Sequence, residues 1–205
     1  RGCFSAFYSH PTGLLCWLKN GWPIKAQALG RRHYPQGPNG IPYIDQNFDS
    51  YSVEYTFADG AKMFLDGRCM TGSNVIYSSY AHGSKGMAVV SDHNDCWLPS
   101  RTSNGQNAER AKRIWTSKNV PAEDDPYVNE WNDLTDAIRN NKPYNEVKRG
   151  VEASVTTSMG RMAAHTGQEI TFEQMLNHEV EDGPGADKLT LTSPSPLMPD
   201  AKGNY

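Results

Sequence analysis

A histidine directly ahead of a proline is the residue best placed to do chemistry in this chain. His10 precedes Pro11, and proline is favoured at the first position of a helix, where its missing N–H group is not needed. We expect a helix from about Pro11 to Lys19, with His10 at its positive end. That end disfavours the imidazolium ion, so a neutral imidazole could accept a proton near neutral pH. The alternative is a helix-start histidine that meets only backbone or solvent.

The other reactive side chains do not form a recognised site. His93, Asp95 and Cys96 are the densest group of metal-binding types, but no matching second group lies at zinc-ligand spacing. The glycine-rich stretches match neither G-x-G-x-x-G nor G-x-x-x-x-G-K-[ST], and a G-x-S-x-G elbow is absent. We therefore predict no metal site and no cofactor-binding residues on this chain. Aromatic residues beside polar loops could form a platform for a sugar, although packing under a loop is the better explanation for each one alone: Trp22, Tyr34, Tyr43 and Trp97.

Composition limits the class of protein. The chain has 205 residues, 37% of them hydrophobic, which is enough for a sizeable core. A net charge of -3 argues against a general binder of nucleic acid or anionic membranes, and no run approaches the roughly 18 apolar residues of a membrane span. Four well-separated cysteines without a C-x-x-C pair predict free thiols: Cys3, Cys16, Cys69 and Cys96.

The first half of the chain is predicted to form mainly β-strands. Residues 50–57 alternate between apolar and polar side chains, and the run 62–69 follows after Asp59-Gly60, which together predict a β-hairpin. We expect further strands at 24–29, 87–91 and 113–117. Two polar or proline-rich segments, 30–47 and 92–107, are predicted to be loops.

The second half of the chain is predicted to form mainly helices. Asp124-Asp125-Pro126 should open a helix that Lys142-Pro143 closes, and a long helix should cover 145–166. A short last helix, 171–177, begins with the capping-box pair Thr171 and Gln174. The long helix carries small residues that should let it approach a sheet closely: Gly150, Ala153, Ser154, Gly160, Ala163 and Ala164.

These elements predict an α+β fold, with a predominantly antiparallel open sheet and helices packed on one face. We assign residues 1–182 to this domain and residues 183–205 to an extended C-terminal tail.

Several stretches, in the right order, resemble motifs of the Gfo/Idh/MocA oxidoreductase family. Residues 2–17 are similar to GGxxxDxGxHxxDxxxW, with Gly2, His10 and Trp17 in register. The later stretches resemble the family's LGGxPxxVxA, xxxxFxDG, GTKG, EhxDLxxAIRxGKP and GRMAAYTGxxVTW motifs, at residues 20–26, 51–60, 82–86, 129–139 and 160–171 respectively. The likeness is to the C-terminal half of such bacterial dehydrogenases.

The resemblance implies a dihydrodipicolinate-reductase-like second domain whose open sheet mediates oligomerisation. An N-terminal Rossmann domain, absent from this chain, would bind NAD or NADP, and a sugar or cyclitol would lie between the two halves. In the family, a lysine from the first half acts with an aspartate and a histidine from the second. His10 matches that histidine, but Ala6 and Gly13 stand where carboxylates are expected, and Pro11 disfavours a helical backbone at His10. Arg31 and Arg68 are candidate contacts for a polyol or acid.

Three functions follow as alternatives. The first is the substrate-binding and oligomerisation half of an NAD(P)-dependent oxidoreductase, or of an NAD-dependent redox-assisted glycosidase, with this half inactive alone. The second is a non-catalytic oligomerisation or interaction module, which the missing carboxylates favour. The third is a freestanding carbohydrate-binding domain. The expected partners are the Rossmann half, further copies of the chain and a small carbohydrate-like molecule, in the cytoplasm or, through an upstream signal, the periplasm.

Overall fold

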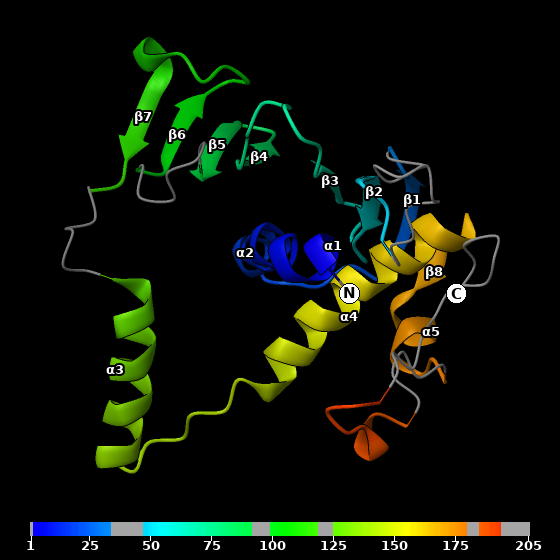
Figure 1. Cartoon of the computed structure of the whole chain (residues 1–205). Coiled ribbons are helices and arrows are strands. Elements are labelled where there is room, and N and C mark those ends of the chain that lie inside the picture. The colour runs from blue at the N-terminus through cyan, green and yellow to red at the C-terminus, as the bar shows by residue number, and fades with distance from the viewer. Residues whose placement is uncertain (1, 34–46, 92–98, 119–124, 180–184, 194–205) are drawn as a thin grey trace. The chain divides into compact units, whose positions relative to one another are not determined.

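The computed structural model describes residues 2–33, 47–91, 99–118, 125–179 and 185–193 (Figure 1). The chain divides into two compact units, residues 1–71 with 152–205, and residues 72–151. Each unit contains its own antiparallel four-stranded sheet. The α+β class is therefore confirmed, but the expectation of a single sheet is wrong. The domain boundary at residue 182 stays a prediction.

The first unit combines helices with the sheet β3-β2-β1-β8. The helices α1 and α2 precede the strands, and the long helix α4 follows the second unit in sequence. The bounds are α1 Gly2–Phe7, α2 Ser9–Lys19, β1 Lys25–Arg31, β2 Ser50–Thr56, β3 Lys62–Arg68, α4 Val147–Thr166, β8 Ile170–Thr171, α5 Phe172–Leu176 and the 3₁₀ turn η2 Ala186–Lys188.

The predicted hairpin is present as β2 and β3, which pair antiparallel from Ser50↔Arg68 to Thr56↔Lys62. Gly60 adopts a φ of 84° in the connecting turn, a conformation that glycine adopts without steric cost. The backbone N–H of Gly60 donates to the carbonyl of Phe57 at 3.0 Å, which closes the turn. The alternation of apolar side chains correctly gave the face of β2 that is buried, because Tyr51, Val53 and Tyr55 all lie in the core.

The core of this unit lies between the sheet and the helices. It is formed by buried side chains of α1, α2, the strands and α4, namely Phe4, Cys16, Ala26, Tyr51, Val53, Tyr55, Phe57, Met63, Met159 and Ala163. The opposite face of the sheet carries exposed residues, including Leu29 at 77% and Phe64 at 66% exposure. Helices thus cover one face and leave the other open, as predicted.

The small residues of α4 allow the predicted close approach to the sheet. A Cβ atom at Gly160 would contact the buried hydroxyl of Tyr55, and would lie 2.9 Å from its Cζ and 3.0 Å from Cγ1 of Val53. On the neighbouring strand, a Cβ at Gly30 would first overlap the ring of Phe48 and would also lie 3.2 Å from the Cβ of Ala164. Gly160 therefore allows the close contact between α4 and β2, whereas Gly30 mainly leaves room for the ring of Phe48.

An unpredicted helical segment, α1, precedes α2, and α2 itself begins at Ser9 instead of Pro11. Pro11 has no N–H to donate to the carbonyl of Phe7, and its ring crowds that carbonyl. The helix is therefore interrupted at Tyr8, although Tyr8 keeps helical dihedral angles (φ -78°, ψ -11°). Hydrogen bonds from the N–H of Tyr8 to Phe4 and from Thr12 to Tyr8, both 3.2 Å, continue across the break.

The second unit contains the sheet β4-β5-β6-β7, the helix α3 and the beginning of α4. Its elements are β4 Ser79–Gly83, β5 Gly86–Ser91, β6 Arg101–Asn104, the 3₁₀ turn η1 Arg110–Lys112, β7 Arg113–Thr116 and α3 Pro126–Arg139. The strand β6 lies inside a segment predicted to be a loop, because its sequence, RTSN, has no apolar alternation. Its neighbours, and not its own side chains, make it a strand.

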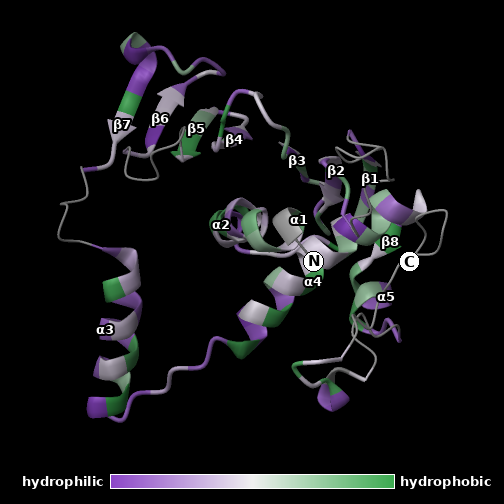
Figure 2. Ribbon diagram, viewed as in Figure 1, coloured by the Kyte–Doolittle hydropathy of each residue, from purple (hydrophilic) through white to green (hydrophobic). Residues whose placement is uncertain are grey.

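Capping residues hold two helices at the predicted starts. The carboxylate of Asp125 accepts a hydrogen bond from the N–H of Tyr127 at 2.8 Å, with Pro126 as the first residue of α3. Thr171 and Gln174 form the capping box of α5, with reciprocal bonds of 3.1 and 2.8 Å. Although α3 is amphipathic, several of its apolar side chains are exposed, and Figure 2 shows hydrophobic and hydrophilic residues interleaved along it.

One other expectation needs correction. Cys69 is bonded in a disulfide, so the prediction of free thiols is wrong for that residue, whereas Cys16 is free and buried. In the predicted tail, residues 186–188 form a 3₁₀ turn, and residues 183–184 and 194–205 lie outside the described ranges, so the extended tail stays a prediction.

Candidate functional site

His10 lies on the solvent-exposed side of the helical segment formed by α1 and α2. Residues at helical spacing share this side, and those around His10 are apolar. Phe7 and Trp17 lie three residues before it and seven after it, and both are more than 60% exposed. The imidazole therefore sits within an uncharged apolar stripe, which we call the α2 stripe: Phe7, His10, Gly13, Leu14, Trp17 and Leu18.

The local geometry of His10 differs from the predicted one. His10 is the second residue of α2 and is helical despite preceding Pro11, and α1 continues the helical path ahead of it. The positive end of a helix dipole acts over the first turn, where N–H groups are free. Because α1 supplies carbonyl acceptors at this point, the argument for a neutral imidazole from a helix start no longer holds. His10 keeps its exposure, and its catalytic role stays a prediction.

Ala6 and Gly13 lie one turn to either side of His10. Residues at i-4 and i+3 face the same side of a helix, so carboxylates at these positions would flank the imidazole. Neither residue provides one, and an ideal Cβ at Gly13 would meet no atom within 4 Å. The position of the second expected carboxylate is thus open space beside the imidazole.

Arg31 and Arg68 lie together, but not with His10. They pair with the same residue, Ser50, from either side, so the three side chains form one row across β1, β2 and β3. Gly67 points toward the helices, because a Cβ there would lie 2.6 Å from Cε2 of Tyr8, and side chains alternate along a strand. The two guanidinium groups therefore belong to the open face of the sheet, opposite the side that α2 covers. A role for them in substrate binding stays a prediction.

Beside the exposed Leu29 and Phe64, the open face carries paired charged side chains. The ammonium group of Lys25 lies 2.8 Å from the carboxylate of Glu169, and that of Lys62 lies 2.6 Å from Glu54. These ion pairs are substantially exposed, and such pairs contribute about 0–1 kcal/mol each. They orient the side chains on this face more than they stabilise the fold.

A cluster that the sequence did not reveal surrounds His165, near the end of α4. The hydroxyl of Tyr51 accepts the backbone N–H of Phe48 at 2.8 Å and lies 3.0 Å from Nε2 of His165. Phe48 stacks on the imidazole with ring centroids 4.1 Å apart and planes 3° apart. Partial burial, together with the nearby positive charges of Arg161 and Arg32, lowers the pKa of His165 to about 4.

The hydrogen bonds assign a structural role to this cluster. With a pKa near 4, His165 is neutral at neutral pH, so its Nε2 can accept the proton of the Tyr51 hydroxyl. The cluster thereby fixes the chain at Phe48 against α4, just before β2 begins. Only the alternation that buries Tyr51 could have pointed to it, because 114 residues separate the two hydrogen-bonded side chains.

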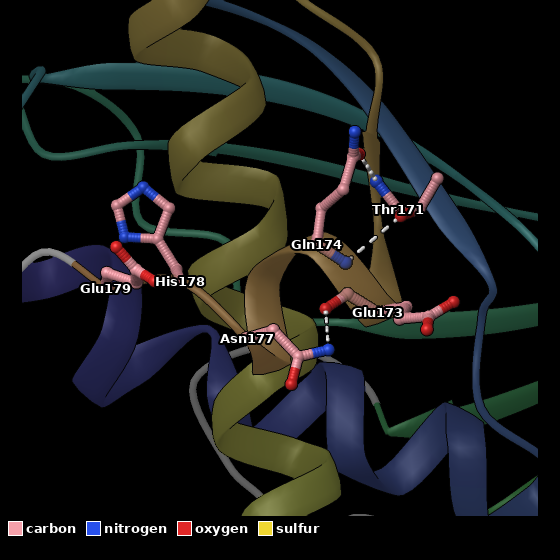
Figure 3. Close-up of a pocket in the computed structure, with 6 residues that line it drawn as sticks. All are labelled: Thr171, Glu173, Gln174, Asn177, His178 and Glu179. Carbon is pink, nitrogen blue, oxygen red and sulfur yellow. Dashed lines mark hydrogen bonds between the residues drawn. The ribbon is translucent and has the colours of Figure 1, made fainter.

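A shallow depression beside α5 is a poor candidate site. Figure 3 shows that two of its lining residues, Thr171 and Gln174, are engaged with each other in the capping box. The amide of Asn177 donates to the carbonyl of Glu173 at 3.0 Å. None of the six residues that line it is buried.

One glycine-rich segment and the arrangement of possible metal ligands can be described in the part of the chain that the structure covers. The glycine-rich segment Gly83–Gly86 joins β4 to β5, and the amide of Gln106 donates to the carbonyl of Gly83 at 2.7 Å, so the segment is a braced hairpin and not a turn that opens a helix. Within the described ranges, no three His, Cys, Asp or Glu side chains gather to hold a metal. His93, Asp95 and Cys96 lie outside those ranges. As far as the description extends, no helix has the length and apolar character that a membrane span requires.

Comparison with solved structures places the fold among oxidoreductases. Levoglucosan dehydrogenase in complex with NADH and L-sorbose matches 86% of this chain and 52% of its own, with a TM-score of 0.64 and 15% identity. An oxidoreductase domain protein from Kribbella flavida matches 84% of this chain and 50% of its own, with a TM-score of 0.64 and 16% identity. Aldose-aldose oxidoreductase from Caulobacter crescentus, complexed with glycerol, matches 80% of this chain and 45% of its own, with a TM-score of 0.59 and 14% identity.

These likenesses establish the class of fold. The chain adopts an α+β fold found within oxidoreductase chains, and it spans about half the length of the structures that it matches. No family model and no curated protein sequence matches the chain.

Proposed function

We propose that this chain is the substrate-side half of a Gfo/Idh/MocA-type NAD(P)-dependent oxidoreductase that acts on a sugar or cyclitol. The observation that carries the proposal is the α2 stripe, an exposed apolar surface whose single ionisable side chain is His10. The fold that contains it matches about half the length of several oxidoreductase chains. Apolar stripes of this kind mark surfaces that another domain or a ligand covers. The matched structures contain NADH with levoglucosan or L-sorbose, which supports this substrate class.

The cofactor and the proton-transferring side chain are assigned to different halves of the oxidoreductase. The matched structures contain NADH and are about twice as long as the part that this chain matches, which supports the assignment of NAD or NADP to a Rossmann half. What this chain contributes is an exposed imidazole that can exchange a proton with a substrate hydroxyl, on a helix held rigidly by Phe4, Thr12 and Cys16 in the core. Without carboxylates at Ala6 and Gly13, His10 has no acidic partner from its own helix.

The test uses the complete oxidoreductase that carries this chain. His10→Ala should reduce kcat by about 10²-fold or more, the usual contribution of a general acid–base. His178→Ala, at an exposed histidine outside the α2 stripe, is the matched control and should leave kcat unchanged. Equal turnover of wild type and His10→Ala would refute the assigned role and leave a non-catalytic interaction module as the better account. Release of a free glycoside leaving group during turnover would indicate a redox-assisted glycosidase.

The open sheet face supports a second part of the proposal, homo-oligomerisation. This face combines exposed Leu29 and Phe64 with ordered ion pairs, as an interface with an apolar centre and a polar rim requires. Arg31 and Arg68 lie at one end of it, where subunit contacts are the alternative to the predicted contacts with a polyol or acid. Phe64→Glu should convert the oligomer to monomers, as measured by light scattering. Leu191→Glu, a control in the tail, should leave the oligomer intact.

A further inference from the structure

We propose that Asn104 is a site of spontaneous covalent modification, at which the backbone nitrogen of Gly105 displaces the side-chain amide and an acid takes its place. Two Asn-Gly steps within the described ranges carry the inference, Asn20-Gly21 and Asn104-Gly105, and neither belongs to the proposed function. A third step, Asn39-Gly40, lies outside those ranges.

The reaction needs only water. The backbone nitrogen of Gly105 gives up its proton and attacks Cγ of Asn104, the bond between Cγ and Nδ2 breaks, and ammonia leaves with that proton. Glycine favours the attack, because it has no Cβ to crowd the nitrogen and its backbone turns freely. Water then opens the cyclic imide at Cγ to give aspartate, or at the backbone carbonyl carbon to give isoaspartate, whose main chain contains an additional carbon.

The backbone around Asn104 leaves this reaction open. Asn104 is the last residue of β6, and the pairing with both β5 and β7 ends one residue earlier, at Ser103. Its side chain is exposed, and the side-chain amide makes no hydrogen bond with any described residue. The N–H of Gly105 lies 3.5 Å from the carbonyl of Lys85, at the outer limit for a hydrogen bond, so the attacking nitrogen is only weakly held.

The step Asn20-Gly21 has the same chemistry but is held in place. Asn20 caps α2 in the left-handed conformation (φ 54°, ψ 48°), and its N–H donates to the carbonyl of Trp17 at 3.0 Å. The N–H of Gly21 donates to the carbonyl of Cys16 at 3.1 Å, so the attacking nitrogen is engaged by the helix end. Because both hydrogen bonds must open first, the folded chain should modify Asn20 about tenfold or more slowly than Asn104.

Modification at Asn104 acts on the hairpin of β4 and β5. Gln106, two residues further on, braces this hairpin: its Nε2 donates to the carbonyl of Gly83 at 2.7 Å, and its Oε1 lies 2.7 Å from Nδ1 of His82. An additional main-chain carbon at position 104 shifts Gln106 relative to the paired part of β6, whereas aspartate adds only a charge. Isoaspartate should therefore loosen the hairpin, and aspartate should not.

The test is incubation of the complete folded protein at mildly alkaline pH, followed by peptide mapping with mass spectrometry and chromatographic separation of isoaspartate. We expect Asn104 to be converted about tenfold or more faster than Asn20. Incubation in urea is the matched control, because the unfolded chain should modify the two asparagines at similar rates. Equal rates in the folded protein, faster conversion of Asn20, or conversion of Asn104 in urea alone would overturn the inference.

Hydrogen exchange tests the effect on the hairpin. The backbone amides of β4 and β5 should exchange faster in the isoaspartate fraction and in Gln106→Ala, which removes the brace directly. Asn104→Asp carries the charge without the additional carbon, and it should exchange as the unmodified protein does. An isoaspartate fraction whose exchange equals that of the unmodified protein would refute the loosening of the hairpin.

Discussion

Gly160→Ala gives the sharpest test of how α4 packs on the sheet. In an exposed helix interior this substitution stabilises by about 1 kcal/mol, because alanine has the higher helix propensity. At position 160 the new methyl group would meet the hydroxyl of Tyr55 and lie 2.9 Å from Cζ, with Cγ1 of Val53 at 3.0 Å. Tyr55 is fully buried and cannot turn into solvent. Overpacking costs about 1–3 kcal/mol before the helix gain is subtracted, and contacts this close belong to the upper part of that range, about 2–3 kcal/mol.

The net expectation is a destabilisation of about 1–2 kcal/mol, which lowers Tm by roughly 2–8 °C in a chain of this size. Urea unfolding followed by circular dichroism measures the free energy of unfolding directly. Gly150→Ala, in the same helix, is the matched control, because its Cβ would meet nothing within 4 Å, and it should stabilise by up to about 1 kcal/mol.

Tyr55→Phe provides the mechanistic check. The hydroxyl of Tyr55 is buried and has no hydrogen-bond partner among the described residues, and its removal also eliminates the closest atom to the new methyl group. The double variant should therefore recover part of the loss, with a coupling of about 0.5–3 kcal/mol. If Gly160→Ala is as stabilising as Gly150→Ala, the close approach of α4 and β2 is refuted.

Three further predictions concern individual side chains. The pKa of His165 is lowered to about 4, so between pH 6.5 and 4 the unfolded chain binds more protons than the folded chain, and stability should fall as the pH is lowered through that range. Because the residue is partly exposed, we expect the free energy of unfolding to drop by about 1 kcal/mol. Urea unfolding at several pH values measures the drop, which should be absent in His165→Gln. Thr171→Ala removes the cap of α5 and should cost about 1 kcal/mol by the same assay, whereas Thr171→Ser should retain most of it. Burial raises the pKa of the Cys16 thiol to about 12, so iodoacetamide should label it in denaturant but not in the native chain at pH 8, and rapid native labelling would contradict its burial.

The sequence predicted elements wherever local chemistry and tertiary packing agree. The alternation in β2, the turn at Gly60 and the capping box of α5 each depend on residues within a few positions of one another. The hairpin register and the buried face follow directly from them. The small residues of α4 likewise predicted a close contact, and the structure adds which of them make it, Gly160 and Ala164.

The sequence predictions fail for elements whose secondary structure is decided by contacts between residues far apart in the chain. β4 and β6 are short and polar, so only pairing with β5 identifies them as strands. The separate second sheet follows from that pairing and could not be read from the sequence. Pro11 suggested a helix start, yet α1 lies ahead of it, because a proline in the first turn of α2 interrupts a helical path without ending it.

The candidate site shows the same division. The sequence context of His10 makes it a candidate, but the α2 stripe is recognised only once Phe7 and Trp17 are known to be exposed. Arg31 and Arg68 are candidates for polyol or acid contacts from their type alone, and only the strand register shows where they lie. Their common partner Ser50 places them on the far side of the sheet from α2.

The disulfide at Cys69 bears on how the protein must be produced. Cys69 follows the last residue of β3, and its N–H donates to the carbonyl of Asp49 at 2.8 Å, so the cross-link is anchored at the end of the open sheet. Such a bond forms where thiols are oxidised and is lost where glutathione keeps them reduced. Material expressed in a reducing cytosol and material matured under oxidising conditions would therefore be two chemically different preparations, and binding or oligomerisation measured on one would not describe the other.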